Sequence, residues 1–197
     1  MEITAARVKE LREKTGIGMM KCKEALAECE GDFEKAIDYL RKKGLATADK
    51  KGGRATDEGR VASYIHTNNK IGVMLEINCE TDFVAKGEEF GQLAKDICMQ
   101  IAASSPIAVR RDDIPADVVE REKEIYKDQA KGKPENIVDK IVEGKLNAYF
   151  KNTCLLEQPF IRDTSVVIED LVKEKIAKFG ENITVSRFVR YQLGEEA

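Results

Sequence analysis

One short stretch of the sequence decides the fold: Asn78-Cys79-Glu80-Thr81-Asp82-Phe83-Val84-Ala85-Lys86. In the residues that lead into it, apolar side chains alternate with other side chains from Ile71 to Cys79, which predicts a strand with one apolar face. In the residues that follow it, apolar side chains recur at helical spacing, at Phe90, Leu93, Ala94, Ile97 and Ile101. The stretch therefore predicts a corner at which a strand passes into a helix.

The corner carries an acidic residue next to an aromatic one, Asp82 and Phe83. Asp82 suits the start of a helix, because free backbone N–H groups and the helix dipole favour negative charge there. Phe83 lies seven residues before Phe90, almost two helical turns, so an unbroken helix would bury both on one face. Gly87, however, is typical of a helix break or of a later helix start. Periodicity alone therefore leaves both a buried and an exposed Phe83 open.

Residues 1–45 predict a bundle of three short helices. Thr4 and Asp32 are candidate N-caps, and glycines separate the helices, with Gly44 closing the third. Three short helices joined by glycine-containing turns resemble the ubiquitin-associated type of bundle, which is a binding module. Residues 46–59 then become polar and lose apolar periodicity, most clearly over residues 50–54, so we interpret them as a linker.

Residues 60–197 predict a second domain that mixes strands and helices. Alternation from Val61 to Ile65 and from Ile71 onward, across a turn at residues 67–70, predicts a hairpin. Helical spacing predicts four helices: one over residues 88–103, one from Pro115 to about Ala130, one after Pro134, and one that Thr164 caps and Gly180 ends. A last strand follows over residues 183–193. The chain is therefore predicted as α+β, with an N-terminal ubiquitin-associated-like bundle, a linker, and a core with a small antiparallel sheet and several helices.

The composition argues against nucleic acids and membranes as direct partners. The 197 residues carry a net charge of −3 and a pI of about 5.5, so no overall basic field attracts nucleic acid or an anionic membrane. Aromatic residues make up 6% of the chain and tryptophan is absent, which disfavours a base-stacking platform. No apolar run reaches transmembrane length, and residues 1–10 contain no apolar signal core. The five cysteines show no CxxC pairing, so we expect reduced thiols and a soluble, cytoplasmic protein.

The sequence contains few residue patterns that are typical of enzymes. His66 is the only histidine and lies beside a turn, where a histidine is usually a surface residue. The sequence contains no serine–histidine–aspartate spacing, no zinc-ligand spacing and no glycine-rich phosphate loop. We therefore predict no catalytic residue, no metal ligand and no cofactor, and a protein that acts by binding. An enzyme built on Cys79 and His66 is the weakest of the alternatives.

Three stretches in both predicted domains carry a family resemblance. They are Val8–Gly16 continuing into Gly18–Leu26, then Asn78–Lys86, and then Leu155–Phe160, with a further match at Arg187–Tyr191. Together and in this order they resemble the bacterial elongation factor Ts family, the guanine nucleotide exchange factors of elongation factor Tu. Longer members carry a duplicated core and a protruding coiled-coil insert, so at 197 residues this chain resembles the short form with one core copy.

The resemblance implies a mechanism without a covalent step. In the family, the N-terminal helical module binds the nucleotide domain of elongation factor Tu. Carried onto this chain, the contact residues of that module are Gly18, Met19, Met20 and Lys23. The Asp-Phe pair, here Asp82 and Phe83, pushes between helices near the Mg²⁺ and phosphate site of elongation factor Tu and promotes GDP release. Thr81 is then expected to cap the corner and Val84 to support it, and an exposed Phe83 is favoured over a buried one.

A generic helical binding module is the alternative function. It would be an adaptor or a chaperone that uses the N-terminal bundle on a partner other than elongation factor Tu. A GDP-release assay with elongation factor Tu separates this hypothesis from the exchange factor and from the enzyme.

The last strand predicts a two-fold homodimer. Both of its faces carry apolar side chains, with Val185, Val189 and Tyr191 on one face and Phe188 on the other. One face can pack on the helices, but the second core copy that covers or extends the sheet in longer relatives is missing. Exposed apolar sheet surface usually marks an interface, and a two-fold axis is the commonest way to close one. The opposing hypothesis is a monomer in which the charged helix over residues 115–130 covers that surface.

Overall fold

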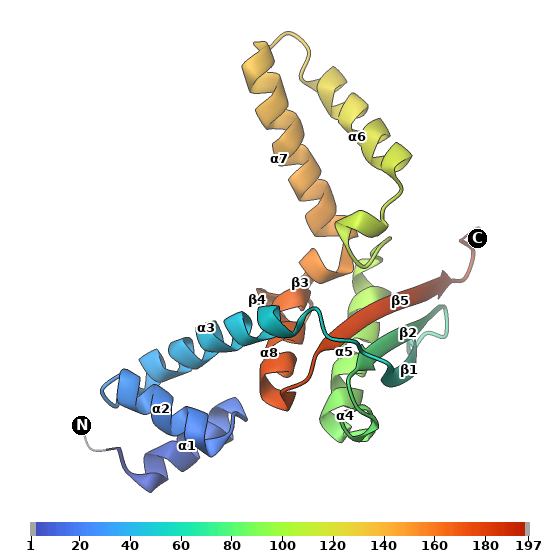
Figure 1. Cartoon of the computed structure of the whole chain (residues 1–197). Coiled ribbons are helices and arrows are strands. Elements are labelled where there is room, and N and C mark those ends of the chain that lie inside the picture. The colour runs from blue at the N-terminus through green and yellow to red at the C-terminus, as the bar shows by residue number, and fades with distance from the viewer. Residues whose placement is uncertain (1–2, 196–197) are drawn as a thin grey trace. The chain divides into compact units, whose positions relative to one another are not determined.

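The computed structural model describes residues 3–195, apart from the side chains of residues 135 and 136, and shows a mixture of helices and strands (Figure 1). The α-helices are α1 (Ala5–Thr15), α2 (Met19–Glu28), α3 (Phe33–Lys51), α4 (Asp82–Lys86), α5 (Glu88–Ser104), α6 (Ala116–Gln129), α7 (Glu135–Thr153) and α8 (Ile168–Phe179). The strands are β1 (Glu58–Ile65), β2 (Ile71–Cys79), β3 (Pro159–Phe160), β4 (Asp163–Val167) and β5 (Ile183–Gln192), and the short 3-10 helices are η1 (Arg111–Asp113) and η2 (Leu155–Glu157). The predicted α+β class is confirmed.

The described residues divide into two compact units. The first contains the residues up to 59 together with residues 78–90 and 170–184, and the second contains residues 60–77, 91–169 and those from 185 onward. The corner at residues 78–86 therefore belongs to the same unit as the N-terminal helices. The assignment of residues 1–45 to a separate domain, with residues 46–59 as its linker, stays a prediction.

The first three helices form a small bundle with its own core. Thr4 caps α1 by accepting a hydrogen bond from the backbone N–H of Arg7 at 3.4 Å, and Asp32 caps α3 by accepting one from Lys35 at 3.1 Å. α1 ends at Gly16, whose φ of 68° is in the left-handed region that glycine adopts without steric cost. The buried side chains of this core are Val8, Leu11, Cys22, Ala25, Leu26, Ala36 and Leu40. The predicted three helices are confirmed, and their likeness to the ubiquitin-associated bundle stays a prediction.

The third helix is longer than predicted, because Gly44 does not end it. α3 continues to Lys51, and Ala48, one turn after the glycine, is buried. A glycine inside a helix costs only about 1 kcal/mol relative to alanine, so packing contacts can outweigh it. At position 44 the missing side chain permits a close approach, since a Cβ atom there would lie 3.1 Å from the Cβ of Ala177 in α8. The helix therefore includes the first part of the segment predicted as a linker.

A three-stranded antiparallel sheet has the strand order β1-β2-β5. β1 and β2 form the predicted hairpin, in which the N–H of His66 donates to the carbonyl of Ile71 at 2.9 Å and Asn69 in the turn has a φ of 55°. The end of β5 lies beside the start of β2, since the N–H of Leu193 donates to the carbonyl of Lys70 at 2.8 Å. The predicted alternation of β2 is confirmed by its buried residues, which are Val73, Leu75, Ile77 and Cys79.

The other face of the sheet is open and carries exposed apolar side chains. Gly72 and Glu76 alternate with the buried residues of β2 and therefore lie on this face. Nε of Arg187 lies 2.7 Å from the Glu76 carboxylate, and a Cβ atom at Gly72 would lie 3.1 Å from Ile65, so Arg187 and Ile65 lie on the same face. The apolar side chains exposed there are Val61 and Ile65 of β1, Met74 of β2, and Val189 and Tyr191 of β5. Val185 was predicted on the same face but is buried, and two adjacent exposed residues after it, Ser186 and Arg187, interrupt the alternation of β5. We call this surface the open sheet face.

A second, smaller hairpin was not predicted: β3 pairs antiparallel with β4, with Phe160 opposite Asp163. Thr164 lies inside β4, so the prediction that it caps the fourth helix is wrong, and α8 begins at Ile168. β3 is only two residues long, which is too short for alternation to be visible in the sequence. β3 is therefore defined by its pairing with β4.

Gln158, in the stretch Leu155–Phe160, is buried directly after η2. Its side-chain amide donates to the carbonyl of Asn152 at 2.7 Å, and its oxygen accepts from Gln100 of α5 at 3.1 Å. Gln100 is also fully buried, and its own oxygen accepts from the backbone N–H of Ile161 at 2.9 Å. Buried polar groups need such partners, so this stretch joins α5, α7 and β3 inside the second unit.

α6 and α7 lie side by side as a helical hairpin (Figure 1). A proline immediately precedes each helix, Pro115 before α6 and Pro134 before α7, close to the predicted positions. Since α6 pairs with α7 and the open sheet face stays exposed, the hypothesis that α6 covers the sheet is wrong. None of the helices within residues 3–195 has the length and apolar character needed to cross a membrane.

Candidate partner-binding site

The corner between β2 and α4 is built as predicted, with Thr81 as the helix cap. β2 ends at Cys79, and Thr81 has an extended backbone (φ −129°, ψ 152°) before α4 begins at Asp82. The Thr81 hydroxyl oxygen accepts a hydrogen bond from the backbone N–H of Val84 at 3.4 Å, which satisfies a free donor of the first helical turn. α4 is only five residues long and ends at Gly87, whose backbone is extended (φ −62°, ψ 143°).

Phe83 projects into solvent, with 84% of its surface exposed, whereas Phe90 is 0% exposed. Because Gly87 interrupts the helix between them, the two phenylalanines do not share a helical face. The question that periodicity left open is therefore answered in favour of exposure. Val84 and Ala85 are buried, so α4 packs on the first unit through these two side chains while Phe83 stays free of the core.

Asp82 lies beside Phe83 and pairs with Lys86 one turn further along α4. Nζ of Lys86 donates to Oδ2 of Asp82 at 2.6 Å, and both side chains are largely exposed. The hydrogen bond from Lys86, followed by its positive charge, lowers the pKa of Asp82 below its ordinary value of 3.8. The carboxylate is therefore ionised near neutral pH, and the corner presents an aromatic ring next to a negative charge.

A shallow groove of about 620 Å³ lies along the corner. Its lining comes from α4, from the start of α5 and from the end of α8: Asp82, Phe83, Val84, Lys86, Gly87, Glu88, Glu89, Lys178 and Phe179. Within this lining Lys178 pairs with Glu89 at 2.6 Å, and the hydrogen bond from Lys178 lowers the pKa of Glu89. The groove therefore offers apolar surface next to charged groups.

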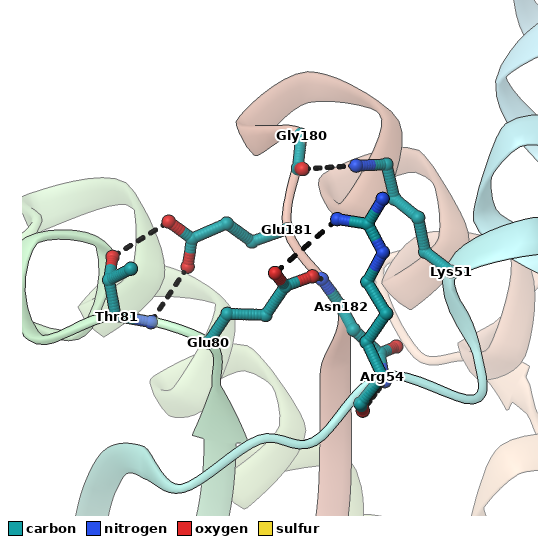
Figure 2. Close-up of polar contacts among 7 residues, drawn as sticks. All are labelled: Lys51, Arg54, Glu80, Thr81, Gly180, Glu181 and Asn182. Atoms are coloured by element: carbon teal, nitrogen blue, oxygen red, sulfur yellow. Dashed lines mark hydrogen bonds and ion pairs between the residues drawn. The ribbon is translucent and has the colours of Figure 1, made fainter.

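Figure 2 shows the contacts that join the corner to the turn between α8 and β5. The Glu181 carboxylate accepts two hydrogen bonds from Thr81, one from the backbone N–H at 3.0 Å and one from the hydroxyl at 2.7 Å. Glu80 accepts one from the backbone N–H of Asn182 at 2.6 Å, and this bond is the largest of the effects that lower the pKa of Glu80. Two carboxylates thus hold the corner and the turn together.

The same turn is tied to the segment between α3 and β1 (Figure 2). Nη1 of Arg54 lies 3.4 Å from the Glu80 carboxylate, and the carbonyl of Arg54 accepts from the Asn182 side chain at 2.8 Å. Lys51, at the end of α3, donates to the carbonyl of Gly180. Polar contacts therefore hold the part of the chain that the sequence predicted as a linker.

These supporting residues were not predicted from the sequence. Glu181 lies 100 residues from Thr81, and Asn182 lies 102 residues from Glu80 and 128 from Arg54. Periodicity and capping rules act over a few residues and say nothing about such pairs. The one available signal was the position of Glu80 inside the corner stretch.

The residues predicted to contact a partner through the N-terminal bundle lie on its surface. Gly18 is the N-cap of α2, and Met19, Met20 and Lys23 are exposed, with Met20 at 78%. The inward positions of the same helix are Cys22, Ala25 and Leu26. Methionine is flexible and polarisable and suits an adaptable contact surface. These residues belong to the same compact unit as the corner.

Cys79 and His66, the two residues of the enzyme hypothesis, make contacts that are typical of structural residues. Cys79 is fully buried and its thiol donates to the carbonyl of Thr81 at 3.2 Å. Burial raises the pKa of Cys79, which disfavours the nucleophilic thiolate. Nδ1 of His66 lies 3.0 Å from the hydroxyl of Tyr64. These contacts argue against a nucleophilic cysteine.

Comparison with known proteins identifies the family. The family model described as Elongation factor TS matches residues 48–195, a range that includes the corner and its supporting turn. The chain belongs to the elongation factor Ts family. Elongation factor Ts of Thermodesulfovibrio yellowstonii is 64% identical over 196 residues, which cover 99% of this chain and 98% of that protein.

Two further elongation factor Ts proteins match over a similar range. The one from Fervidobacterium nodosum is 60% identical, over 99% of this chain and 100% of its own, and the one from Thermotoga petrophila is 58% identical, over 99% and 98%. The chain and these relatives therefore have closely similar lengths. The predicted family is confirmed, and the protein is a translation elongation factor.

Proposed function

We propose that this protein binds elongation factor Tu in the cytoplasm and promotes GDP release by inserting Asp82 and Phe83 near the Mg²⁺ and phosphate site of elongation factor Tu. The observation that carries the proposal is the 84% exposure of Phe83 beside an ionised carboxylate, at the start of a capped helix. Aromatic side chains of this kind are typical hot spots of protein interfaces. The factor needs no covalent step, no cofactor and no direct contact with nucleic acid or membrane, so it acts as an exchange factor and not as an enzyme.

Linkage explains how binding of such a pair can release a nucleotide. We call Asp82 and Phe83 the wedge, and it binds best when the metal and phosphates of the partner are displaced. By linkage, the bound wedge must weaken nucleotide binding by the same factor. The ring supplies apolar contact, and a carboxylate close to a metal or a phosphate disturbs the local charge balance. Rebinding of nucleotide then displaces the exchange factor.

The test of the wedge is Phe83→Ala in a stopped-flow assay of GDP release from elongation factor Tu. We expect the maximal accelerated rate to fall about 30-fold, which corresponds to about 2 kcal/mol for a hot-spot aromatic residue. Ile107→Ala is the matched control, because Ile107 is 58% exposed and lies in the second unit. Normal acceleration by Phe83→Ala would contradict the wedge. No acceleration by the unmodified protein would favour a binding module for another partner.

The N-terminal helices are proposed to supply affinity, with residues 1–45 as a bundle, 46–59 as a linker and 60–197 as the core domain. The contact residues are Gly18, Met19, Met20 and Lys23, which are exposed. We expect Met20→Ala to raise the concentration of factor needed for half-maximal GDP release and to leave the maximal rate unchanged. A fall in the maximal rate alone would contradict this division of roles.

The open sheet face is proposed to form a two-fold homodimer. Its exposed apolar side chains would be covered by the same face of a second copy, and closed two-fold contacts are the commonest kind. Analytical ultracentrifugation at micromolar concentration should give the dimer mass, and Met74→Glu should shift it to the monomer. A monomer mass for the unmodified protein would contradict the dimer.

A further inference from the structure

Thr81, the cap of α4, is held by a carboxylate 100 residues away in the sequence. Both oxygens of Glu181 take part, Oε2 accepting from the Thr81 backbone N–H at 3.0 Å and Oε1 from its hydroxyl at 2.7 Å (Figure 2). An ionised carboxylate only accepts hydrogen bonds, so it matches two donors from one residue. Charge-assisted bonds of this kind are stronger than neutral ones.

This contact also sets the direction of the Thr81 hydroxyl. A hydroxyl has one proton and two lone pairs. Because Glu181 accepts the proton, a lone pair is left for the backbone N–H of Val84, which lies 3.4 Å from the hydroxyl oxygen. Consecutive hydrogen bonds polarise and strengthen one another. Glu181 therefore acts on the first turn of α4, although it lies outside that helix.

We propose that Glu181 is a positioning residue for the wedge, a role that rests on the proposed function. Its carboxylate fixes the backbone N–H and the hydroxyl of Thr81, and Thr81 fixes the start of α4, from which Phe83 projects. Preorganisation of a contact group reduces the cost of ordering it in the state in which it makes its contact, and for the wedge that is the bound state with the metal and phosphates displaced. Without the carboxylate, Asp82 and Phe83 are still present, but the start of α4 that holds them is less rigidly fixed.

The neighbouring contacts separate this role from a role in folding. The turn that carries Glu181 has its own supports, since Asn182 bonds with Glu80 and Arg54, and Gly180 accepts from Lys51. These contacts do not involve the Glu181 side chain. The bonds from Thr81 to Glu181 are exposed to solvent, so a change at Glu181 removes a local restraint and little buried surface.

The first test measures hydrogen exchange of the Val84 amide by NMR in the free, full-length protein. Glu181→Gln keeps the size of the side chain and replaces one acceptor oxygen with a donor group. We expect it to speed the exchange of Val84 about tenfold, equivalent to about 1.4 kcal/mol. Glu174→Gln is the matched control, because it removes the same charge from α8, where Glu174 pairs with Arg41. Unchanged exchange of Val84 in Glu181→Gln would overturn the proposal.

The second test measures GDP release from elongation factor Tu as a function of factor concentration. We expect Glu181→Gln to lower the maximal rate about tenfold and to change the half-saturating concentration less than about twofold. Thr81→Val removes one of the two donors that Glu181 accepts from Thr81, so adding Glu181→Gln to it should lower the rate by a smaller factor than Glu181→Gln does alone. Fully additive effects, or a change in the half-saturating concentration alone, would overturn the proposal.

Failure of the proposed function would look different from failure of the positioning role. The unmodified protein would then not accelerate GDP release, while Glu181→Gln would still speed the exchange of Val84. That result would overturn the wedge and the part of Glu181 in it. Thermal unfolding completes the comparison: a loss of stability in Glu181→Gln as large as that of a core substitution would assign Glu181 to folding and overturn the positioning role.

Discussion

Phe83 and Phe90 are the same type of residue, only seven positions apart, and the structure treats them in opposite ways. Phe83 in α4 is 84% exposed, and Phe90 in α5 is completely buried. In one continuous helix the two rings would point in nearly the same direction. The difference arises because two helices, and not one, contain them.

The break at Gly87 separates the two helices. Its extended backbone ends α4 after five residues, and α5 then starts with its own orientation. In α4 only Val84 and Ala85 are buried, whereas α5 buries a continuous apolar stripe that begins with Phe90. The position of a phenylalanine is thus decided by the direction of its helix as much as by its own hydrophobicity.

The largest expected effect is the stability difference between the two phenylalanines. Phe90→Ala should lower the free energy of unfolding by about 3–5 kcal/mol, because it removes a fully buried ring and leaves a cavity. Phe83→Ala should change it by no more than about 0.5 kcal/mol, since its ring has few contacts to lose. Urea unfolding of both variants measures this contrast. Similar losses in the two variants would mean that Phe83 is part of the core.

A smaller effect is expected from Gly87→Ala, which acts on the break itself. The φ of −62° suits alanine, but the new Cβ would lie 3.0 Å from the backbone carbonyl oxygen of Val84, so the backbone must shift. We expect a loss of about 1 kcal/mol in the free energy of unfolding. Gly53→Ala is the control, because nothing lies within 4 Å of a Cβ at that position. If Gly87→Ala and Gly53→Ala were equally stable, the break between α4 and α5 would not depend on the absence of a side chain at position 87.

The smallest effect concerns the ion pair that flanks Phe83. Lys86 lowers the pKa of Asp82 below 3.8, and Asp82 raises the pKa of Lys86 above 10.5. The contribution of Asp82 is therefore complete above its unfolded pKa and is lost as the pH falls through the lower folded value. The contribution of Lys86 to stability is complete below pH 10.5 and is lost as the pH rises through the higher folded pKa. The contribution of the ion pair to stability is therefore constant between about pH 5 and pH 9.

The pair is tested by an NMR titration of the Asp82 carboxyl group. Its midpoint should lie below 3.8 in the unmodified protein and move up toward 3.8 in Lys86→Ala. No resolvable change in melting temperature is expected, because exposed ion pairs contribute little to stability. An unchanged midpoint in Lys86→Ala would show that another group lowers the pKa of Asp82.

The corner could be predicted from the sequence because its features are local. The cap bond from Thr81 spans three residues, and the break at Gly87 follows five residues after α4 begins. The periodicity of β2 and α5 was equally visible, since it depends on residues two to four positions apart. The exposure of Phe83 was not decided by periodicity, and the family resemblance was needed to favour it.

Two predictions failed where a distant partner decides the local structure. Gly44 ends no helix, because its close approach to Ala177 and the burial of Ala48 favour continuation of α3. Thr164 caps no helix, because β4 pairs with a strand of only two residues. In both cases local propensity is worth about 1 kcal/mol or less, and tertiary contacts outweigh it.

The sequence by itself determined the α+β class, the strand-to-helix corner, its Thr81 cap and the family, because these depend on spacings of a few residues and on the motif. Only the tertiary structure decided which groups hold that corner: Glu181 on Thr81, and Asn182 with Arg54 on Glu80. Contacts between residues 26 to 102 positions apart leave no periodic trace in a single sequence. They form only because the fold brings the turn after α8 to the end of β2, where each carboxylate finds the donors it requires.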